Sequence, residues 1–148
     1  MKTPVNEKVL REALRILVRK LGILEKSEFT SCEITLAQCH AIVEMGRTEK
    51  ISLNELAETL NLDNSTMSRT VNNLVNNGLA VRETDPEDRR YVTIKLTEKG
   101  QELFMSIEES MEVYYKRIFT AIPEDDRQKV LESMDILLRA INESKCCE

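Results

Sequence analysis

The chain has 148 residues, of which 32% are charged, and its formal net charge at pH 7 is -5. This length suits one compact domain with an oligomerisation region. No apolar run is long enough to cross a membrane, and the N-terminus lacks the pattern of a signal peptide. We therefore expect a soluble, cytoplasmic protein without a membrane partner, whose cysteines are thiols rather than disulfides.

An apolar stripe predicts a helix in the first 34 residues. Thr3 is a candidate cap, and Pro4 suits the first helical position, so we expect the helix to begin there. The stripe is wide enough to need cover from outside its own chain. It consists of Val9, Leu10, Ala13, Leu14, Ile16, Leu17 and Leu21.

Two capping boxes and one further cap predict the next three helices. Residues 35–38 and 52–55 each place a hydroxyl three residues before a Gln or Glu, and both side chains then bind free amides of a helix start. Asp63 or Asn64 caps the following helix. Because Asn61 and Leu62 alone interrupt the last two helical patterns, these helices form a helix-turn-helix.

The helix after Asp63 has a polar face of unusual composition. Met67, Val71, Leu74 and Val75 recur at helical spacing and face the core. The opposite face lacks carboxylates, which phosphate would repel, and carries groups that bind phosphates and base edges. The expected DNA contacts on it are Ser65, Thr66, Ser68, Arg69, Asn72 and Asn73.

A β-hairpin with arginines at its tip follows this helix, which ends at Asn77-Gly78. Residues 79–84 and 91–96 read as strands, and Asp85-Pro86 starts the turn. In isolation, Arg89, Arg90 and the neighbouring acids could form only a solvated loop with internal ion pairs. After a helix-turn-helix, a DNA-binding wing is the better interpretation, with Asp88 bracing an arginine that enters the minor groove.

Two more helices complete the chain. The first carries apolar residues from Leu103 to Ile122 at steps of three or four, and Pro123 opens the second, which has acids in its first turn. These helices either complete a core within one chain or interleave with those of a second chain. The apolar residues of the last helix are Val130, Leu131, Met134, Leu137, Leu138 and Ile141.

The sequence resembles the MarR family of bacterial and archaeal transcriptional regulators over nearly its whole length. The resemblance lies in residues 34–38, 77–79, 85–90 and 96–100 and in the helix pair. Its most specific part is the Asp-x-Arg pattern of Asp88 and Arg90, followed by a strand and Leu96-Thr97-x-x-Gly100.

The resemblance implies a mainly α fold with a small β-hairpin (α+β), a winged helix-turn-helix with N- and C-terminal dimerisation helices. Residues 1–34 and 98–148 would serve dimerisation, and residues 35–97 would form the DNA-binding domain. The implied function is a homodimer that binds pseudo-palindromic operators in double-stranded DNA, usually as a repressor. Arg90 matches the residue that enters the minor groove.

The effector that controls DNA binding is less determined. The resemblance favours a small organic ligand, and no cofactor is required. The alternative is a switch based on a soft metal, a metalloid or thiol oxidation, because thiolate and imidazole ligands suit such ions. That switch would use Cys32, Cys39, His40, Cys146 and Cys147. However, Cys39 stands where an apolar residue is expected, and buried cysteine behaves as a small hydrophobe.

Two other function classes need to be considered: a module that binds proteins and an enzyme. Residues 52–97 carry five positive and seven negative side chains, so DNA binding requires a local positive face. The same balance permits a winged-helix module that binds proteins instead of DNA. An enzyme is not expected, because the chain has one histidine, no Gly-rich loop and no poised acid–base pair. A small thiol-redox protein remains an alternative because Cys146 and Cys147 are adjacent, but a C-terminal tail does not provide a shaped pocket for a substrate.

Overall fold

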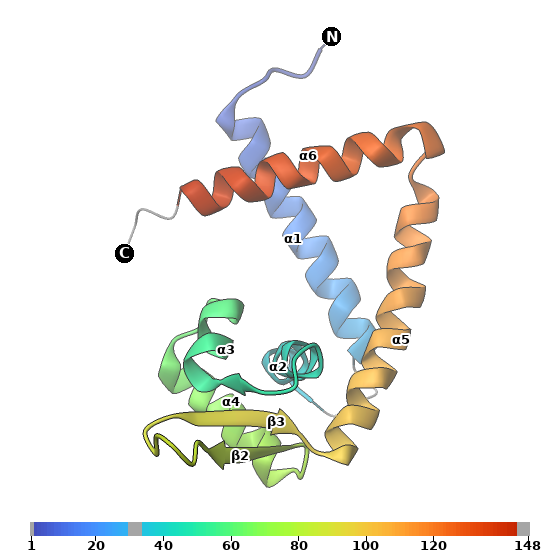
Figure 1. The fold of residues 1–148 in the computed structure, drawn as a ribbon. Coiled ribbons are helices and arrows are strands. Elements are labelled where there is room, and N and C mark those ends of the chain that lie inside the picture. Colours follow the sequence, from blue (N-terminus) through green and yellow to red (C-terminus); the bar gives the residue numbers. More distant parts are fainter. Residues whose placement is uncertain (1, 30–33, 145–148) are drawn as a thin grey trace. The chain divides into compact units, whose positions relative to one another are not determined.

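The computed structural model describes residues 2–29 and 34–144, with the backbone alone for residues 23–29. Its elements are α1 (Glu7–Phe29), α2 (Leu36–Gly46), β1 (Ile51–Ser52), α3 (Leu53–Leu60), α4 (Asn64–Asn76), β2 (Ala80–Thr84), β3 (Val92–Leu96), α5 (Glu98–Ala121) and α6 (Glu124–Glu143) (Figure 1). The chain divides into two compact units, residues 1–108 and 109–148, and α5 crosses the division. Among the described residues, no helix combines the length and apolarity that a membrane span requires.

The fold is mainly helical with one small antiparallel sheet, as the sequence predicts. The sheet has the order β1-β3-β2, so the hairpin of β2 and β3 gains a third strand. In β1, Ile51 pairs with Ile94 and Ser52 pairs with Thr93. This strand escapes prediction because two residues are too short to show alternation, and because Ser52 also caps α3.

Most of the buried apolar side chains among the described residues lie in the first unit, on helices α2, α3 and α4, the sheet and the start of α5. On α4, Met67, Val71 and Leu74 are buried as predicted, and Ile94 and Leu96 of β3 are buried as well. This packing fixes which face of α4 remains outside. The largest fully buried side chains are Ile42, Met45, Leu56, Met67, Leu74, Ile94, Ile107, Val71 and Cys39.

Most of the predicted helix starts are confirmed. Both capping boxes are present, at Thr35 with Gln38 and at Ser52 with Glu55. The predicted start at Thr3 and Pro4 is wrong, because α1 begins at Glu7. Asn6 takes the capping position there, and its Oδ1 accepts a hydrogen bond from the amide of Val9 at 3.0 Å.

Asp63 caps α4 and thereby fixes where the helix begins. Its carboxylate accepts hydrogen bonds from the Ser65 hydroxyl at 2.8 Å and from the Thr66 amide at 3.1 Å. Hydrogen bonds with the side chains of Thr66, the largest cause, and of Ser65, the next largest, lower the pKa of Asp63 below its ordinary value of 3.8. A lowered pKa means that the ionised cap stabilises the fold above pH 3.8, and that this contribution is lost as the pH falls through the folded-state pKa.

We therefore expect Asp63→Ala to lower the melting temperature at pH 7, with a difference from wild type that shrinks below about pH 4. Asp63→Asn is the matched control: asparagine caps a helix equally well, so it should keep most of the stability and lose the pH dependence. Thermal unfolding followed by circular dichroism between pH 3 and 7 measures both variants. Equal melting temperatures for Asp63→Ala and wild type at pH 7 would contradict the assigned cap.

Thr97 and Gly100 form the junction between the sheet and α5. The Thr97 hydroxyl donates to the carbonyl of Gly78 at 2.6 Å, and its amide donates to the carbonyl of Leu79 at 3.0 Å. The amide of Gly100 in turn donates to the Thr97 hydroxyl at 3.1 Å. The pattern Leu96-Thr97-x-x-Gly100 therefore caps α5 and fastens the turn after α4, where Gly78 has a positive φ of 73°.

The second unit contains the end of α5 and α6, joined by a corner that Arg127 stabilises. The guanidinium of Arg127 donates to the carbonyls of Ile122 at 3.1 Å and Thr120 at 3.3 Å, and it lies 4.9 Å from the centre of the Phe119 ring. No residue of α6 is buried in the single chain. Large apolar side chains on α6 are instead exposed: Val130, Leu131, Met134, Ile136, Leu138 and Ile141.

Candidate nucleic-acid interface

Helices α3 and α4 form a helix-turn-helix whose tight turn depends on Asn61. This residue has a left-handed backbone (φ 56°, ψ 40°), which asparagine tolerates better than most residues. The amide of Leu62 donates to the carbonyl of Ala57 at 2.9 Å, which closes the end of α3. The chain then turns directly into the Asp63 cap of α4.

The structure brings the predicted DNA-contact residues of α4 onto its outer face. Ser68 is half-buried and the others are exposed, while the opposite face packs in the core. The Ser65 hydroxyl is already engaged by Asp63, so Ser65 offers its oxygen as an acceptor to further groups. The face comprises Ser65, Thr66, Ser68, Arg69, Asn72 and Asn73.

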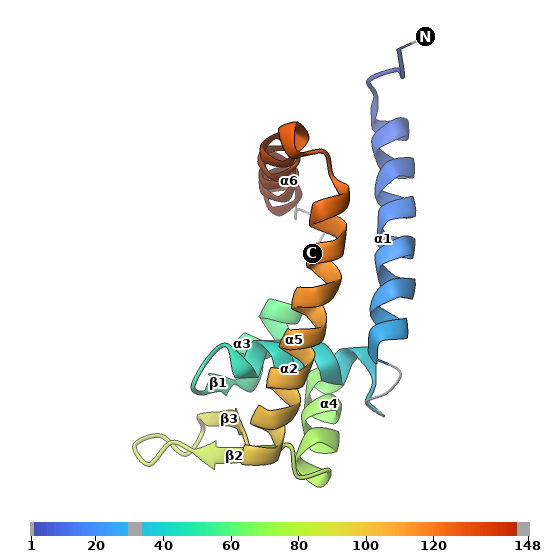
Figure 2. The same ribbon diagram turned by 90° about the vertical axis from the view of Figure 1, so that its right-hand side faces the viewer.

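The hairpin of β2 and β3 with its loop, residues 80–96, is here called the wing, and Figure 2 shows its loop projecting beyond the helices. Two aspartates shape the loop: Asp85 accepts from the amide of Glu87 at 2.9 Å, and Asp88 accepts from the amide of Arg90 at 3.0 Å. Asp88 also contacts the Arg90 guanidinium at 3.3 Å. The Arg90 side chain is nevertheless 92% exposed, so it is held at its base and open at its tip.

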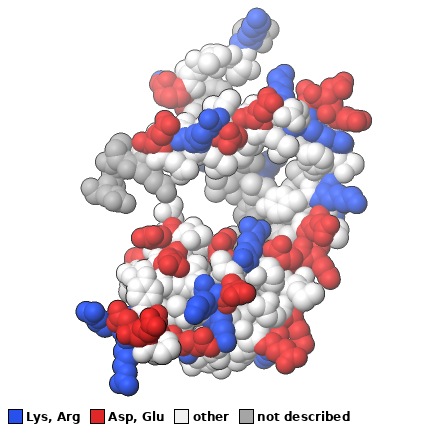
Figure 3. Space-filling model, in the orientation of Figure 1, with Lys and Arg blue, Asp and Glu red and all other residues white. Residues whose placement is uncertain are grey.

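Basic groups lie outermost at the tip of the wing (Figure 3). Figure 3 shows basic atoms projecting at the tip of the hairpin, at the lower left, beyond a group of acidic atoms. Further along the wing, Lys95 and Glu83 form an ion pair at 2.6 Å. The hydrogen bond from Lys95 lowers the pKa of the Glu83 carboxyl, which keeps this acid ionised and paired. Part of the negative charge of the wing is thus neutralised within it.

Arg82 is a residue of this surface that the sequence reasoning did not select. It lies on β2 and donates a hydrogen bond to Oδ1 of Asn72 on α4. The strand register explains this contact, because Arg82 pairs with the buried residue Ile94. Directly paired side chains of an antiparallel sheet lie on the same face, so Arg82 is on the face that packs against the helices. Residues two positions apart in a strand lie on the same face, so the apolar residue Ala80 is the sequence signal that Arg82 faces the helices.

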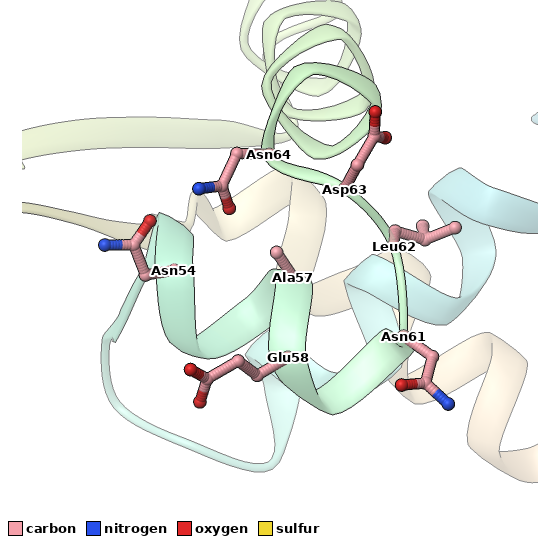
Figure 4. Close-up of a pocket in the computed structure, with 7 residues that line it drawn as sticks. All are labelled: Asn54, Ala57, Glu58, Asn61, Leu62, Asp63 and Asn64. Carbon is pink, nitrogen blue, oxygen red and sulfur yellow. The ribbon is translucent and has the colours of Figure 1, made fainter. Parts of the chain in front are cut away.

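Two surface depressions adjoin the helix-turn-helix. The first lies at its turn, where Figure 4 shows the amides of Asn54 and Asn64 and the carboxylates of Glu58 and Asp63. Its two carboxylates make it unsuitable for phosphate. The second runs between the start of α3 and the loop end of β3, and residues 52–54 and 90–92 line it. Arg90 thus borders a groove that connects the wing to α3.

Of the residues considered for a metal or thiol switch, the structure describes Cys39 and His40. Cys39 is 1% exposed in the core, which confirms the packing interpretation, whereas the adjacent His40 is exposed. Cys32, Cys146 and Cys147 lie outside the described residues. Within residues 2–22 and 34–144, no three Cys, His, Asp or Glu side chains are grouped so as to hold a metal ion.

Comparison with known proteins identifies relatives over most of the chain. Residues 33–90 match the family model described as the MarR family. The chain is 25% identical to the HTH-type transcriptional regulator YfiV of Bacillus subtilis over 150 residues, which covers 97% of this chain and 94% of that protein. FabT of Streptococcus pneumoniae, solved in complex with DNA, has a TM-score of 0.83 at 20% identity and covers 95% of this chain and 100% of its own.

A MarR transcriptional regulator from Methanosarcina mazei Go1 gives a TM-score of 0.80 at 23% identity, with 93% of this chain and 99% of that chain covered. These matches confirm the winged-helix fold and the family that the sequence resembles, and the relatives are transcriptional regulators rather than enzymes. The chain is therefore similar, over residues 33–90, to the MarR family of winged helix-turn-helix transcriptional regulators.

Proposed function

We propose that this protein is a cytoplasmic homodimeric repressor that binds pseudo-palindromic operators in double-stranded DNA. The observation that carries the proposal is the acid-free outer face of α4 beside a wing whose Arg90 side chain is 92% exposed. An α-helix fits the major groove, and an arginine suits the narrow minor groove. The similar protein FabT was solved in complex with DNA, which supports this mode.

Each part of the surface has a role in this proposal. Arg89 and Arg90 enter the minor groove, and Asp88 braces Arg90 through its two contacts. The groove between α3 and the loop end of β3 follows the DNA backbone. The outer face of α4 enters the major groove with Ser65, Thr66, Ser68, Arg69, Asn72 and Asn73.

The homodimer is supported by apolar surface on the terminal helices, which serve dimerisation in residues 1–34 and 98–148. On α1, Leu10 is 49% exposed and Val18 is 70% exposed, and α6 has no buried residue at all. Apolar patches of this kind mark interaction surfaces. A two-fold dimer would place two α4 helices in successive major grooves, about 34 Å apart.

We also propose that a small organic ligand modulates operator binding. Such a ligand need only favour a dimer in which the two α4 helices are wrongly spaced. The burial of Cys39 weighs against the soft-metal, metalloid or thiol alternative, because a switch must be reached by its ion or oxidant. DNA affinity measured with zinc, copper or arsenite, on wild type and a cysteine-free variant, separates the two effectors.

Arg90→Ala is expected to weaken operator binding about tenfold, and to lower the slope of log K against log salt by about one, because one phosphate-region contact is lost. The melting temperature should stay unchanged, since the side chain is exposed. The operator is first selected from random DNA, and affinity is then measured by fluorescence anisotropy between 50 and roughly 200 mM salt.

Arg139→Ala is the matched control, because Arg139 also pairs with an aspartate, at 2.8 Å, but lies on α6. It should leave affinity and slope unchanged. Unchanged binding by Arg90→Ala would remove Arg90 from the minor groove. A wild-type protein that binds no DNA even at low salt would overturn the proposed function and favour the module that binds proteins.

A further inference from the structure

The contact between Arg82 and Asn72 joins the wing to the outer face of α4. Arg82 comes from β2, Asn72 from the third turn of α4, and both side chains are exposed. A guanidinium carries donors only, so the atom of Asn72 that faces it must be the acceptor Oδ1. The amino group of the same side chain is therefore turned away from Arg82. The contact fixes not only where Asn72 lies but also which end of its amide faces outward.

We propose that Arg82 is a positioning residue that orients the Asn72 amide, so that α4 presents N–H donors to DNA at this position. Such donors match base edges that present acceptors without a neighbouring adenine amino group: N7 with O6 of guanine, or O4 of thymine. The bidentate pairing of asparagine with adenine needs Oδ1 as well, and Oδ1 is directed toward Arg82. This inference rests on the proposed DNA binding and specifies which base edges Asn72 binds.

The surroundings of Arg82 favour this role. The strand register pairs it with buried Ile94, so its stem starts on the helix-facing side of the sheet. Two acids of the wing that could compete for a guanidinium have other partners, since Glu83 binds Lys95 and Asp88 binds Arg90. A planar guanidinium loses little freedom when it makes such a contact. Glu83 and Asp88 are thus engaged elsewhere when Arg82 contacts Asn72.

The test selects preferred sequences from random DNA with wild type, Arg82→Ala, Asn72→Ala and the double variant. Wild type should disfavour adenine at one operator position, and Arg82→Ala should relax this discrimination about tenfold because the amide can then turn. Asn72→Ala should lose the preference, and adding Arg82→Ala to it should change nothing further. Arg82→Lys should restore part of the discrimination, because lysine also donates to Oδ1.

Two controls separate positioning from other roles. Replacing Lys95 and Glu83 together by alanine removes a basic side chain of the same wing without releasing its acidic partner, and it should leave the base preference intact. A direct phosphate contact by Arg82 would lower the salt slope by about one, whereas a positioning role leaves the slope unchanged. Thermal unfolding verifies that all variants fold.

The outcomes distinguish this inference from the proposed function. If wild type enriches an operator and Arg82→Ala enriches the same bases with the same discrimination, the positioning role is wrong and the function stands. Additive effects in the double variant also overturn it. If wild type binds no DNA, both fail. Independently of DNA, the NMR signals of the Asn72 side-chain amide should shift in Arg82→Ala, and unchanged signals would exclude the contact in solution.

Discussion

A protein in which Gly100 is replaced by alanine is expected to lose about 3 kcal/mol of unfolding free energy, at the upper end of the cost of overpacking. Gly100 is buried at the junction of β3 and α5, and an added Cβ would overlap the carbonyl oxygen of Leu79. That oxygen belongs to the backbone and accepts the amide of Thr97 at 3.0 Å, so it cannot turn aside as a flexible side chain would. The strain would therefore reach both the turn after α4 and the first turn of α5.

Gly22→Ala is the matched control for this prediction. Gly22 is also helical, and no described atom lies within 4 Å of the position that its Cβ would take. Alanine should stabilise α1 there by about 1 kcal/mol, because it has the higher helix propensity. Urea unfolding at one fixed protein concentration compares the two, since a dimer's stability depends on concentration. Similar changes in both variants would show that the junction relaxes around the new methyl group.

Sequence reasoning predicted those parts of the fold that local chemistry determines. The caps at Thr35, Ser52 and Asp63 depend on residues three positions apart, and all three form as predicted. Local rules also explain the error at Thr3, because several nearby residues could cap α1 and Asn6 does so. Strand β1 depends on pairing with β3, about 40 residues further along the chain, and no short pattern predicts such pairing.

In the candidate interface, too, the sequence predicts the features that depend on local pattern and misses those that depend on tertiary structure. The outer face of α4 follows from helical periodicity and composition, which the sequence displays directly. The contact of Arg82 with Asn72 depends on the strand register and on how the hairpin packs against α4, and thus on tertiary structure. The burial of Cys39 followed from its place in an apolar pattern. The sequence of the operator and the identity of the effector are properties of other molecules, so they cannot be read from this chain.

Leu138→Asp on α6 is expected to dissociate the proposed homodimer, with dimerisation at least ~100-fold weaker because an unpaired charge would be buried in the interface. Leu138 is 55% exposed in the single chain and lies on the predicted stripe with Leu131, Met134 and Ile141. Operator affinity should fall with it, because a monomer presents one α4 helix to a two-fold operator. Analytical ultracentrifugation measures the dimer, and anisotropy measures operator binding by the same samples.

Ile136→Asp is the control that makes this test specific to one face. Ile136 is 63% exposed on the same helix, but two residues of α-helix rotate it about 160° away from Leu138. The same charge introduced there should leave the dimer and operator binding unchanged. Dissociation by both variants would point to loss of α6 structure, which circular dichroism would reveal. If neither variant dissociates the dimer, α6 does not hold two chains together by this stripe, and the exposed face of α1 becomes the dimer contact to test.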